Sequence, residues 1–378
     1  MTAKFLNIQN KPRTNPRALA KLEDFQYLEG ENIDSQIIIN SPNISLYCLE
    51  PASQQGIFVE TPLDVEISDY PFVYNTQFEY AERLIAVPYQ DLFDLAKSIR
   101  NYTQNLILIY SVGRCGSTLL SKVFNQLDYV LSLSEPDVFC YLVGLRTPDG
   151  SLDTQIRELL NICTRLTCQP TPKIKPSWCV IKPRSFCIEI ADLMYELFPH
   201  AKVIFLYRSA ADVIPSFIRA HEDVRPLIQG LEDNLDYYSR FFPLIKSYSD
   251  FIDFSDPNAV DIYSILWLSA MERYLELYQK GVPMLALRYE DLVKSPQQMI
   301  ASIFEYCGLP NSEVTNACKV FEQDSQGGSH LSRERTRKHQ LTESEMIEVN
   351  QKIYRLLEKH PEIRTPDYII PGTLGHNI

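Results

Sequence analysis

Four short apolar runs, at 106–110, 178–181, 202–207 and 284–287, organise the chain beyond residue 100. Runs of four to six mostly apolar residues are typical of strands buried on both faces of a parallel sheet. The stretches between them place apolar residues at helical spacing. This alternation predicts an α/β fold, a doubly wound parallel sheet of P-loop type with helices on both faces.

Turn and capping residues set the limits of several predicted helices. A helix over 262–280 is followed by glycine, and another begins with Ser295 as N-cap, has Pro296 at its first position and stops at Gly308. Thr342, with a glutamate three positions later, forms a capping box that starts the last long helix. A short strand at 130–133 adds to the predicted sheet.

The first hundred residues follow a different pattern. Short strand-like runs lie at 37–39, 44–48 and 56–59, separated by proline and asparagine. Residues 1–30 show no clear periodicity and are predicted to be a mobile arm, and 85–100 is predicted to be helical. These features predict a small β-rich accessory unit at the N-terminus.

We therefore predict two regions with a boundary near residue 101. Residues 1–100 form the accessory unit, and residues 101–378 form the P-loop domain. Within this domain, the charged and aromatic stretch at about 222–262 is predicted to be a helical insertion or lid. Its aromatic pairs, Tyr237 with Tyr238 and Phe241 with Phe242, are assigned to core packing rather than to a ligand pocket.

Composition narrows the class of protein. A net charge of −12 argues against broad nucleic-acid binding, which requires a basic face. No apolar run approaches the roughly 18–20 residues that span a bilayer, and the start of the chain is polar. The nine cysteines include no C-x-x-C pair, so reduced, buried thiols are expected. A cytoplasmic enzyme is the resulting prediction.

The strongest chemical signal is the loop at 111–118, which reads S-V-G-R-C-G-S-T. It follows the first apolar run and leads into a helical pattern, a layout that directs backbone N–H groups and a helix N-terminus at an anion. The loop lacks the lysine that precedes Ser117 in the phosphate-loop consensus, and it contains Arg114 instead. It therefore predicts anion binding without cleavage of a magnesium-bound triphosphate.

Three separated segments resemble the sulfotransferase family. The 111–118 loop resembles its 5′-phosphosulfate loop, with Arg114 where many members carry lysine. Arg208, followed eight residues later by Ser216, is similar to its 3′-phosphate signature, and 287–310 is similar to a late helix-and-turn segment. The resemblance covers about 101–340. It implies a metal-free transfer of a sulfuryl group from 3′-phosphoadenosine 5′-phosphosulfate (PAPS) to a hydroxyl or amine of a small-molecule or carbohydrate acceptor.

The resemblance also implies roles for individual residues. The 5′-phosphosulfate would be held by the loop, namely by Gly113, Arg114, Cys115, Gly116, Ser117 and Thr118. Arg114 would also stabilise the transferring group, and Cys115 is interpreted as a packing residue rather than a nucleophile. Arg208 and Ser216 would bind the 3′-phosphate. The basic, glycine-containing segment with Arg333 and Arg335 would fold over that phosphate.

The proton acceptor is less directly indicated. Many relatives place a histidine two residues after a lysine at the end of a strand, but here Lys182 is followed by Pro183 and Arg184. The segment around Glu135 is similar to one that supplies a glutamate base in carbohydrate-type and some bacterial relatives. Glu135 is therefore the predicted catalytic base, with His221 as the reserve candidate. Lys182 and Arg184 are predicted to neutralise sulfate or acceptor charge.

Two alternatives to a sulfotransferase remain at this stage. One is a nucleotide or small-molecule kinase on a related phosphate-loop scaffold, which the missing loop lysine disfavours. The other is a non-catalytic nucleotide-binding scaffold that uses the first hundred residues to bind partners.

Overall fold

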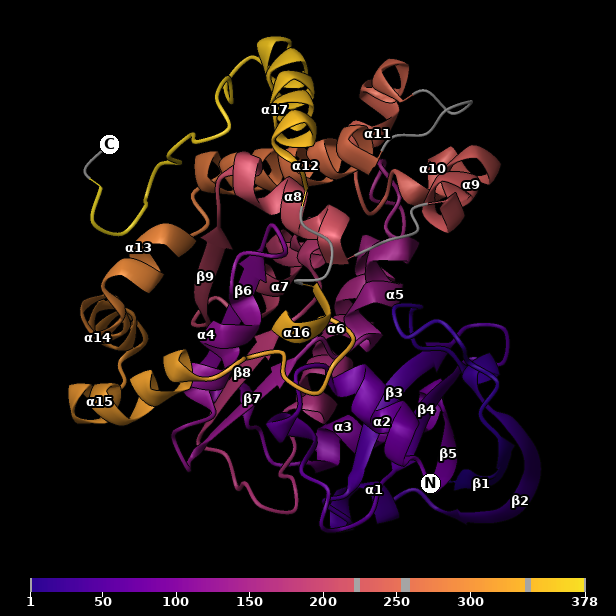
Figure 1. Ribbon diagram of the computed structural model, residues 1–378. Coiled ribbons are helices and arrows are strands. Elements are labelled where there is room, and N and C mark those ends of the chain that lie inside the picture. The colour runs from indigo at the N-terminus through magenta and orange to yellow at the C-terminus, as the bar shows by residue number, and fades with distance from the viewer. Residues whose placement is uncertain (1, 221–224, 253–258, 337–340, 377–378) are drawn as a thin grey trace.

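A five-stranded parallel sheet forms the centre of the computed structural model, which describes residues 2–220, 225–252, 259–336 and 341–376 (Figure 1). The strand order is β10-β9-β6-β8-β7. The bounds are β6 Leu106–Ser111, β7 Val130–Ser134, β8 Trp178–Lys182, β9 Lys202–Tyr207 and β10 Met284–Arg288. The predicted α/β fold is confirmed, and each strand lies within one residue of its predicted run.

Burial explains why the strand pattern was readable from the sequence. All six residues of β6 are buried, because β6 is the central strand and pairs in parallel with β8 on one side and β9 on the other. The helix α4 (Ser117–Phe124) packs against β6, β7 and β8. A strand covered on both faces needs apolar residues at every position, which produces a continuous run rather than alternation.

The predicted helix limits around α12, α14 and α17 agree with the structure. α12 is Ala259–Gln279, α14 is Pro296–Cys307 with Gly308 at φ +80°, and α17 is Glu343–Glu358 with the capping box formed by Thr342 and Glu345. The other helices of the P-loop domain are α5 Val138–Leu145, α6 Asp153–Thr167, α7 Ala191–Leu197, α8 Ala210–Ala220, α13 Tyr289–Lys294, α15 Val314–Ala317 and α16 Arg333–Thr336.

A second, antiparallel sheet with the order β2-β1-β5-β4-β3 occupies the N-terminal region, which is coloured indigo to violet in Figure 1. The bounds are β1 Thr2–Asn10, β2 Gln26–Asp34, β3 Ile44–Glu50, β4 Gln55–Glu60 and β5 Arg83–Pro88. The predicted β-rich unit is therefore present, and the strands expected at 44–48 and 56–59 correspond to β3 and β4.

Two local predictions in this region are wrong, and a helix is predicted to begin too early. Residues 2–34 include β1 and β2 rather than a mobile arm at 1–30, and the strand signal is weak because many positions face solvent. The run at 37–39 begins the short helix α1 (Ile37–Asn40), in which only Ile38 is buried. The predicted helix at 85–100 is α3 (Tyr89–Ser98), preceded by β5. Pairing partners distant in sequence decide these cases.

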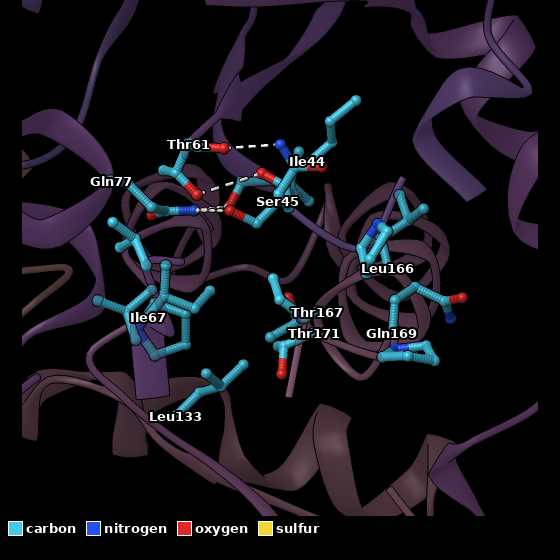
Figure 2. Close-up of a pocket in the computed structure, with 18 residues that line it drawn as sticks. Ile44, Ser45, Thr61, Ile67, Gln77, Leu133, Leu166, Thr167, Gln169 and Thr171 are labelled. Carbon is cyan, nitrogen blue, oxygen red and sulfur yellow. Dashed lines mark hydrogen bonds between the residues drawn. The ribbon is translucent and has the colours of Figure 1, made fainter. Parts of the chain in front are cut away.

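The two sheets meet along an interface that contains a cavity of about 30 Å³, shown in Figure 2. On the N-terminal side, Gln77 from α2 (Val73–Tyr80) donates hydrogen bonds to the Ser45 hydroxyl and the Leu46 carbonyl, at 2.8 and 3.0 Å. Across the interface, the Thr171 hydroxyl donates to the Glu66 carboxylate at 2.6 Å. A space of this size holds about one water molecule, so it is a feature of the interface and not a ligand site.

The described part of the predicted insertion is helical. It contains α9 (Arg225–Asp233), α10 (Leu235–Tyr238) and α11 (Leu244–Ser247), and α11 packs against α12. These helices lie at the upper right of Figure 1, beyond the carboxyl ends of the parallel strands. Residues 221–224 and 253–258 lie outside the described part, so the reserve base candidate His221 does too.

Candidate active site

The carboxyl ends of four parallel strands bring most of the predicted site residues to one edge of the sheet. The 111–118 loop follows β6, Glu135 follows β7, Lys182 ends β8 and Arg208 follows β9. Ligands of open α/β sheets bind at this edge. A cleft of about 560 Å³ opens here, and its lining includes Arg114, Ser117, Thr118, Glu135 and Lys182.

The loop after β6 has the backbone conformation of an anion-binding turn. Gly113, Arg114 and Gly116 all have positive φ, at +78°, +50° and +83°. Glycine is also required by space, since a Cβ at Gly113 would lie 2.7 Å from the Phe217 ring and one at Gly116 would lie 2.6 Å from the Tyr289 ring. Loops of this type point successive N–H groups inward, and here they precede the N-terminus of α4.

Arg114 is held across the mouth of this loop. Its Nε donates to the Ser216 hydroxyl at 3.2 Å, and its Nη1 donates to the Gln326 side-chain oxygen at 2.9 Å. Burial, together with the positive charges of Arg219 and Arg208, lowers the pKa of the guanidinium to about 10. Arg114 therefore belongs to a cluster of arginines whose mutual repulsion an anion would relieve.

The second half of the predicted donor site is arranged around Arg208. Its guanidinium lies over the Tyr289 ring at 4.9 Å and 3.5 Å from the Asp212 carboxylate. Its Nε is buried and has no hydrogen-bond partner among the described residues. The indole of Trp267 donates to the Arg208 carbonyl at 3.0 Å and so fixes the backbone at this point.

Tyr289 explains why the segment at 287–310 belongs to the site. Its ring lies against Gly116 of the loop and beneath the guanidinium of Arg208, so it joins the two halves of the predicted donor site. The next residue, Glu290, accepts a hydrogen bond from the Ser209 N–H at 3.2 Å and orders the end of β9.

Sequence reasoning missed Arg219, which is three residues beyond Ser216 on α8. Residues three apart lie on the same helix face. Burial lowers the pKa of Arg219, and Arg208 lowers it as well, so the two guanidinium groups are electrostatically close. The spacing from Ser216 was the available signal, but only the fold shows that this face points at Arg114.

Cys115 packs within the loop, as the sequence analysis interpreted it. Its side chain is fully buried, and its Sγ donates to the Leu206 carbonyl at 3.2 Å. Burial raises the pKa of the thiol to about 11, which outweighs the helix N-terminus and nearby cations. Only the backbone of Cys115 is available to a ligand.

Glu135 and Lys182 form an ion pair on the wall of the cleft. The Lys182 Nζ lies 2.5 Å from Glu135 Oε1, and the Glu135 N–H donates to the Lys182 carbonyl at 2.6 Å. Glu135 has a φ of +58°, an unusual value for a residue with a side chain, and 17% of its side chain is exposed. The turn after β7 thus directs the carboxylate into the cleft.

Arg184, at the position where many relatives carry histidine, connects two parts of the chain. It forms a bidentate ion pair with the buried carboxylate of Asp137, at 2.7 Å for each contact, and lies over the Tyr74 ring at 4.2 Å. It also donates to the Arg17 carbonyl at 2.8 Å. Its charge is therefore committed to Asp137, which makes it a structural connector.

His330 is a second residue that sequence reasoning did not single out. It lines the cleft together with Glu135, and its ring lies 5.6 Å from that of Phe72. Burial lowers the pKa of the imidazole to about 4, and the charge of Arg17 acts in the same direction, so the ring is neutral at pH 7. In the sequence, only its position two residues after Gly328, in the glycine-containing segment, indicated that His330 lies near the site.

The remaining predicted residues lie near the same cleft or outside the described part. Arg335 is exposed, and its charge reaches His330. The side chains of Arg333 and His221 lie outside the described part. The aromatic pairs assigned to core packing contact the cleft as well: all four, from Tyr237 to Phe242, are among its lining residues, although Phe241 is also buried.

Comparison with known proteins decides the family. A model of the sulfotransferase domain matches residues 104–359. The chain belongs to the sulfotransferase family. A kinase and a non-catalytic scaffold are thereby set aside, and the protein is a PAPS-dependent sulfotransferase whose acceptor is not identified.

Solved structures of sulfotransferases are among the chains to which this one is similar, at low sequence identity. The sulfotransferase domain from the curacin biosynthetic pathway is 18% identical, with 71% of this chain and 93% of that one covered and a TM-score of 0.39. Sulfotransferase STF9 from Mycobacterium avium is 10% identical, with 71% and 79% covered and a TM-score of 0.38. Retinol dehydratase, in complex with androsterone and the inactive cofactor PAP, is 14% identical, with 75% and 87% covered and a TM-score of 0.36. A search of the curated proteins found no match.

The described residues of the sulfotransferase were also compared with the requirements for a membrane-spanning helix and for a metal site. None of its described helices combines the length and apolar character needed to cross a membrane. Within residues 2–220, 225–252, 259–336 and 341–376, no three His, Cys, Asp or Glu side chains converge in an arrangement that would hold a metal ion.

Proposed function

We propose that this sulfotransferase binds PAPS across the ends of β6 and β9 and transfers its sulfuryl group to a hydroxyl or amine presented in the adjoining cleft. The loop N–H groups, with Ser117 and Thr118, bind the 5′-phosphosulfate. Arg208, Ser216 and Arg219 bind the 3′-phosphate, and the segment of α16 that carries Arg333 and Arg335 folds over that phosphate. Arg114 connects the proposed 5′-phosphosulfate and 3′-phosphate sites, because it belongs to the loop and its Nε donates to the Ser216 hydroxyl.

The transfer itself follows from these positions. The acceptor oxygen or nitrogen attacks sulfur, the bond from sulfur to the oxygen of the 5′-phosphate breaks, and adenosine 3′,5′-bisphosphate (PAP) leaves. Glu135 takes the acceptor proton, and Lys182 holds that carboxylate in place. Arg114 and the loop N–H groups stabilise charge on the sulfuryl oxygens and the leaving phosphate. Arginine supplies the charge that magnesium supplies in triphosphate sites, so the proposed transfer requires no metal.

One observation carries this proposal most directly. The charges of Arg208 and Arg219 lower the pKa of Arg114, the charge of Arg208 lowers the pKa of Arg219, and the buried Nε of Arg208 has no hydrogen-bond partner within the described residues. Burying like charges together is unfavourable unless an anion compensates them. A donor with phosphate at both its 3′ and 5′ positions supplies that compensation.

Calorimetric titration with PAP tests the donor site. Arg208→Ala is expected to raise the Kd for PAP roughly 10- to 100-fold, because charge-assisted hydrogen bonds to the 3′-phosphate are lost. Arg157→Ala is the matched control, since Arg157 is an exposed arginine of α6 that pairs only with Glu196 among the described residues. An unchanged Kd in Arg208→Ala would remove this residue from the donor site.

A further inference from the structure

The cleft beside the loop has two chemically different ends. Near the loop it is lined by Arg114, Ser117, Thr118 and Gln326, which suit the charged donor. Elsewhere it is lined mainly by phenylalanine and tyrosine, including Phe186, Tyr237, Tyr238, Phe241 and Phe242. Phe186 packs edge-on against both Phe241 and Phe242, so these rings form a continuous aromatic wall.

The wall on the other side comes from the N-terminal region. Leu19, Phe72 and Tyr74 line the cleft, together with Asn15, Arg17 and Ala18. All six precede residue 104, where the match to the sulfotransferase domain begins. Part of the cleft lining is therefore supplied by residues outside the matched domain.

The segment carrying Leu19 is fixed to the catalytic domain. Arg184 donates to the carbonyls of Arg17 and Ala18, at 2.8 and 3.4 Å, and Asp137 accepts the Ala20 N–H at 3.0 Å. Since Arg184 and Asp137 are themselves paired, one buried ion pair anchors three backbone groups of this segment. The N-terminal wall is thus a positioned element of the site.

The charged side chains of Lys182 and Arg184, next to this aromatic region, already have ion-pair partners. Lys182 is paired with Glu135, and Arg184 with Asp137. A polar acceptor such as a sugar needs several convergent hydrogen-bonding groups, because each buried hydroxyl without a partner is costly. Aromatic faces and Leu19 instead favour an apolar body, with one hydroxyl directed at Glu135.

We propose that the acceptor is a phenol or other hydroxylated apolar ring compound, bound between the insertion and a wall supplied by the N-terminal region. This inference rests on the proposed function and adds the acceptor class to it. The acceptor hydroxyl loses its proton to Glu135 and gains the sulfuryl group of PAPS, giving a sulfate ester and PAP. Residues around Leu19 determine specificity without contacting the donor.

The test measures sulfation of 2-naphthol and of N-acetylglucosamine with PAPS, alongside PAP binding by calorimetry. Leu19→Gln places a polar group in the apolar wall, so the KM for 2-naphthol is expected to rise roughly tenfold while the Kd for PAP stays within about twofold. Leu19→Ala adds no polar group and is expected to raise this KM roughly threefold. It keeps the test decisive if Leu19→Gln fails to fold. Leu28→Gln is the matched control, since Leu28 is 62% exposed on β2 and does not line the cleft.

The outcomes separate this inference from the proposed function. PAP binding without sulfation of 2-naphthol, or a higher kcat/KM for N-acetylglucosamine, would overturn the acceptor class. An unchanged KM in both Leu19 variants would overturn the N-terminal wall. Failure of the unaltered protein to bind PAP would instead contradict the proposed function, on which the inference depends.

Discussion

At the scale of single residues, Glu135 owes its proposed role to two local features. The positive φ of Glu135 turns its carboxylate into the cleft, and Lys182 holds one carboxylate oxygen. Residues forced into unusual backbone conformations cost energy and persist where the surrounding structure fixes them, often at functional sites. The second carboxylate oxygen is the one that can face an acceptor.

Glu135→Gln is expected to lower kcat by roughly 10²- to 10⁴-fold, because an amide keeps the hydrogen-bonding shape but cannot take a proton. The Kd for PAP is expected to stay within about twofold, since Glu135 does not contact the donor in the proposed arrangement. Steady-state kinetics and calorimetry measure the two quantities, and Glu196→Gln, on an exposed pair, serves as control. Normal turnover in Glu135→Gln would exclude it as the base.

At the scale of secondary-structure elements, α8 presents one face to the proposed donor site. Ser216 and Arg219 lie on this face, and Ser216 accepts the hydrogen bond from Arg114. Pro215 sits beside them within the helix, which removes one backbone donor there. The helix therefore connects the loop after β6 with the arginine after β9.

Arg219→Ala is expected to raise the Kd for PAP roughly tenfold, because one of three neighbouring guanidinium groups is lost from the proposed 3′-phosphate site. Its effect is predicted to weaken at high salt, since Arg219 is partly exposed. Titrations at two ionic strengths check both statements. Lys97→Ala, which removes an exposed charge on α3, is expected to leave PAP binding unchanged; an equal effect would mean that only overall charge matters.

At the scale of the whole molecule, a buried ion pair joins the N-terminal region to the catalytic domain. Asp137 is fully buried, and burial raises the pKa of its carboxyl group. Removing one partner of such a pair leaves an uncompensated buried charge, which is more damaging than losing an exposed pair. The same contact holds the chain from Arg17 to Ala20 against the cleft.

Arg184→Met is expected to lower the free energy of unfolding by about 3–5 kcal/mol, because Asp137 is then left buried without its cation. Urea unfolding measures this change. The double variant Arg184→Met/Asp137→Leu is expected to recover part of it, since neither charge remains. In the control pair of Arg157 with Glu196, Arg157→Met is expected to lower the free energy of unfolding by less than about 1 kcal/mol. An equal loss in both pairs would contradict the anchoring role of Arg184.

The central sheet and the loop after β6 were predictable because their signals are local. Strands buried on both faces require continuous apolar runs, and the turn after β6 requires glycine at Gly113 and Gly116. The strands β1 and β2 were missed because many of their positions are exposed and carry polar residues, and only the pairing of β1 with β2 and β5 reveals them.

The sequence by itself determined the donor chemistry: an anion-binding loop with Arg114, a second cationic strand end at Arg208, and their order along the chain. Tertiary structure decided what lies opposite them. It brought Arg219 near Arg114 and Tyr289 beneath Arg208, paired Glu135 with Lys182, and made Arg184 a connector between two parts of the chain. It also brought Leu19 and Phe72, from the N-terminal region, to the cleft beside the 111–118 loop. The physical reason is that a loop's backbone requirements are written in adjacent residues, whereas a wall between two regions depends on how their surfaces pack.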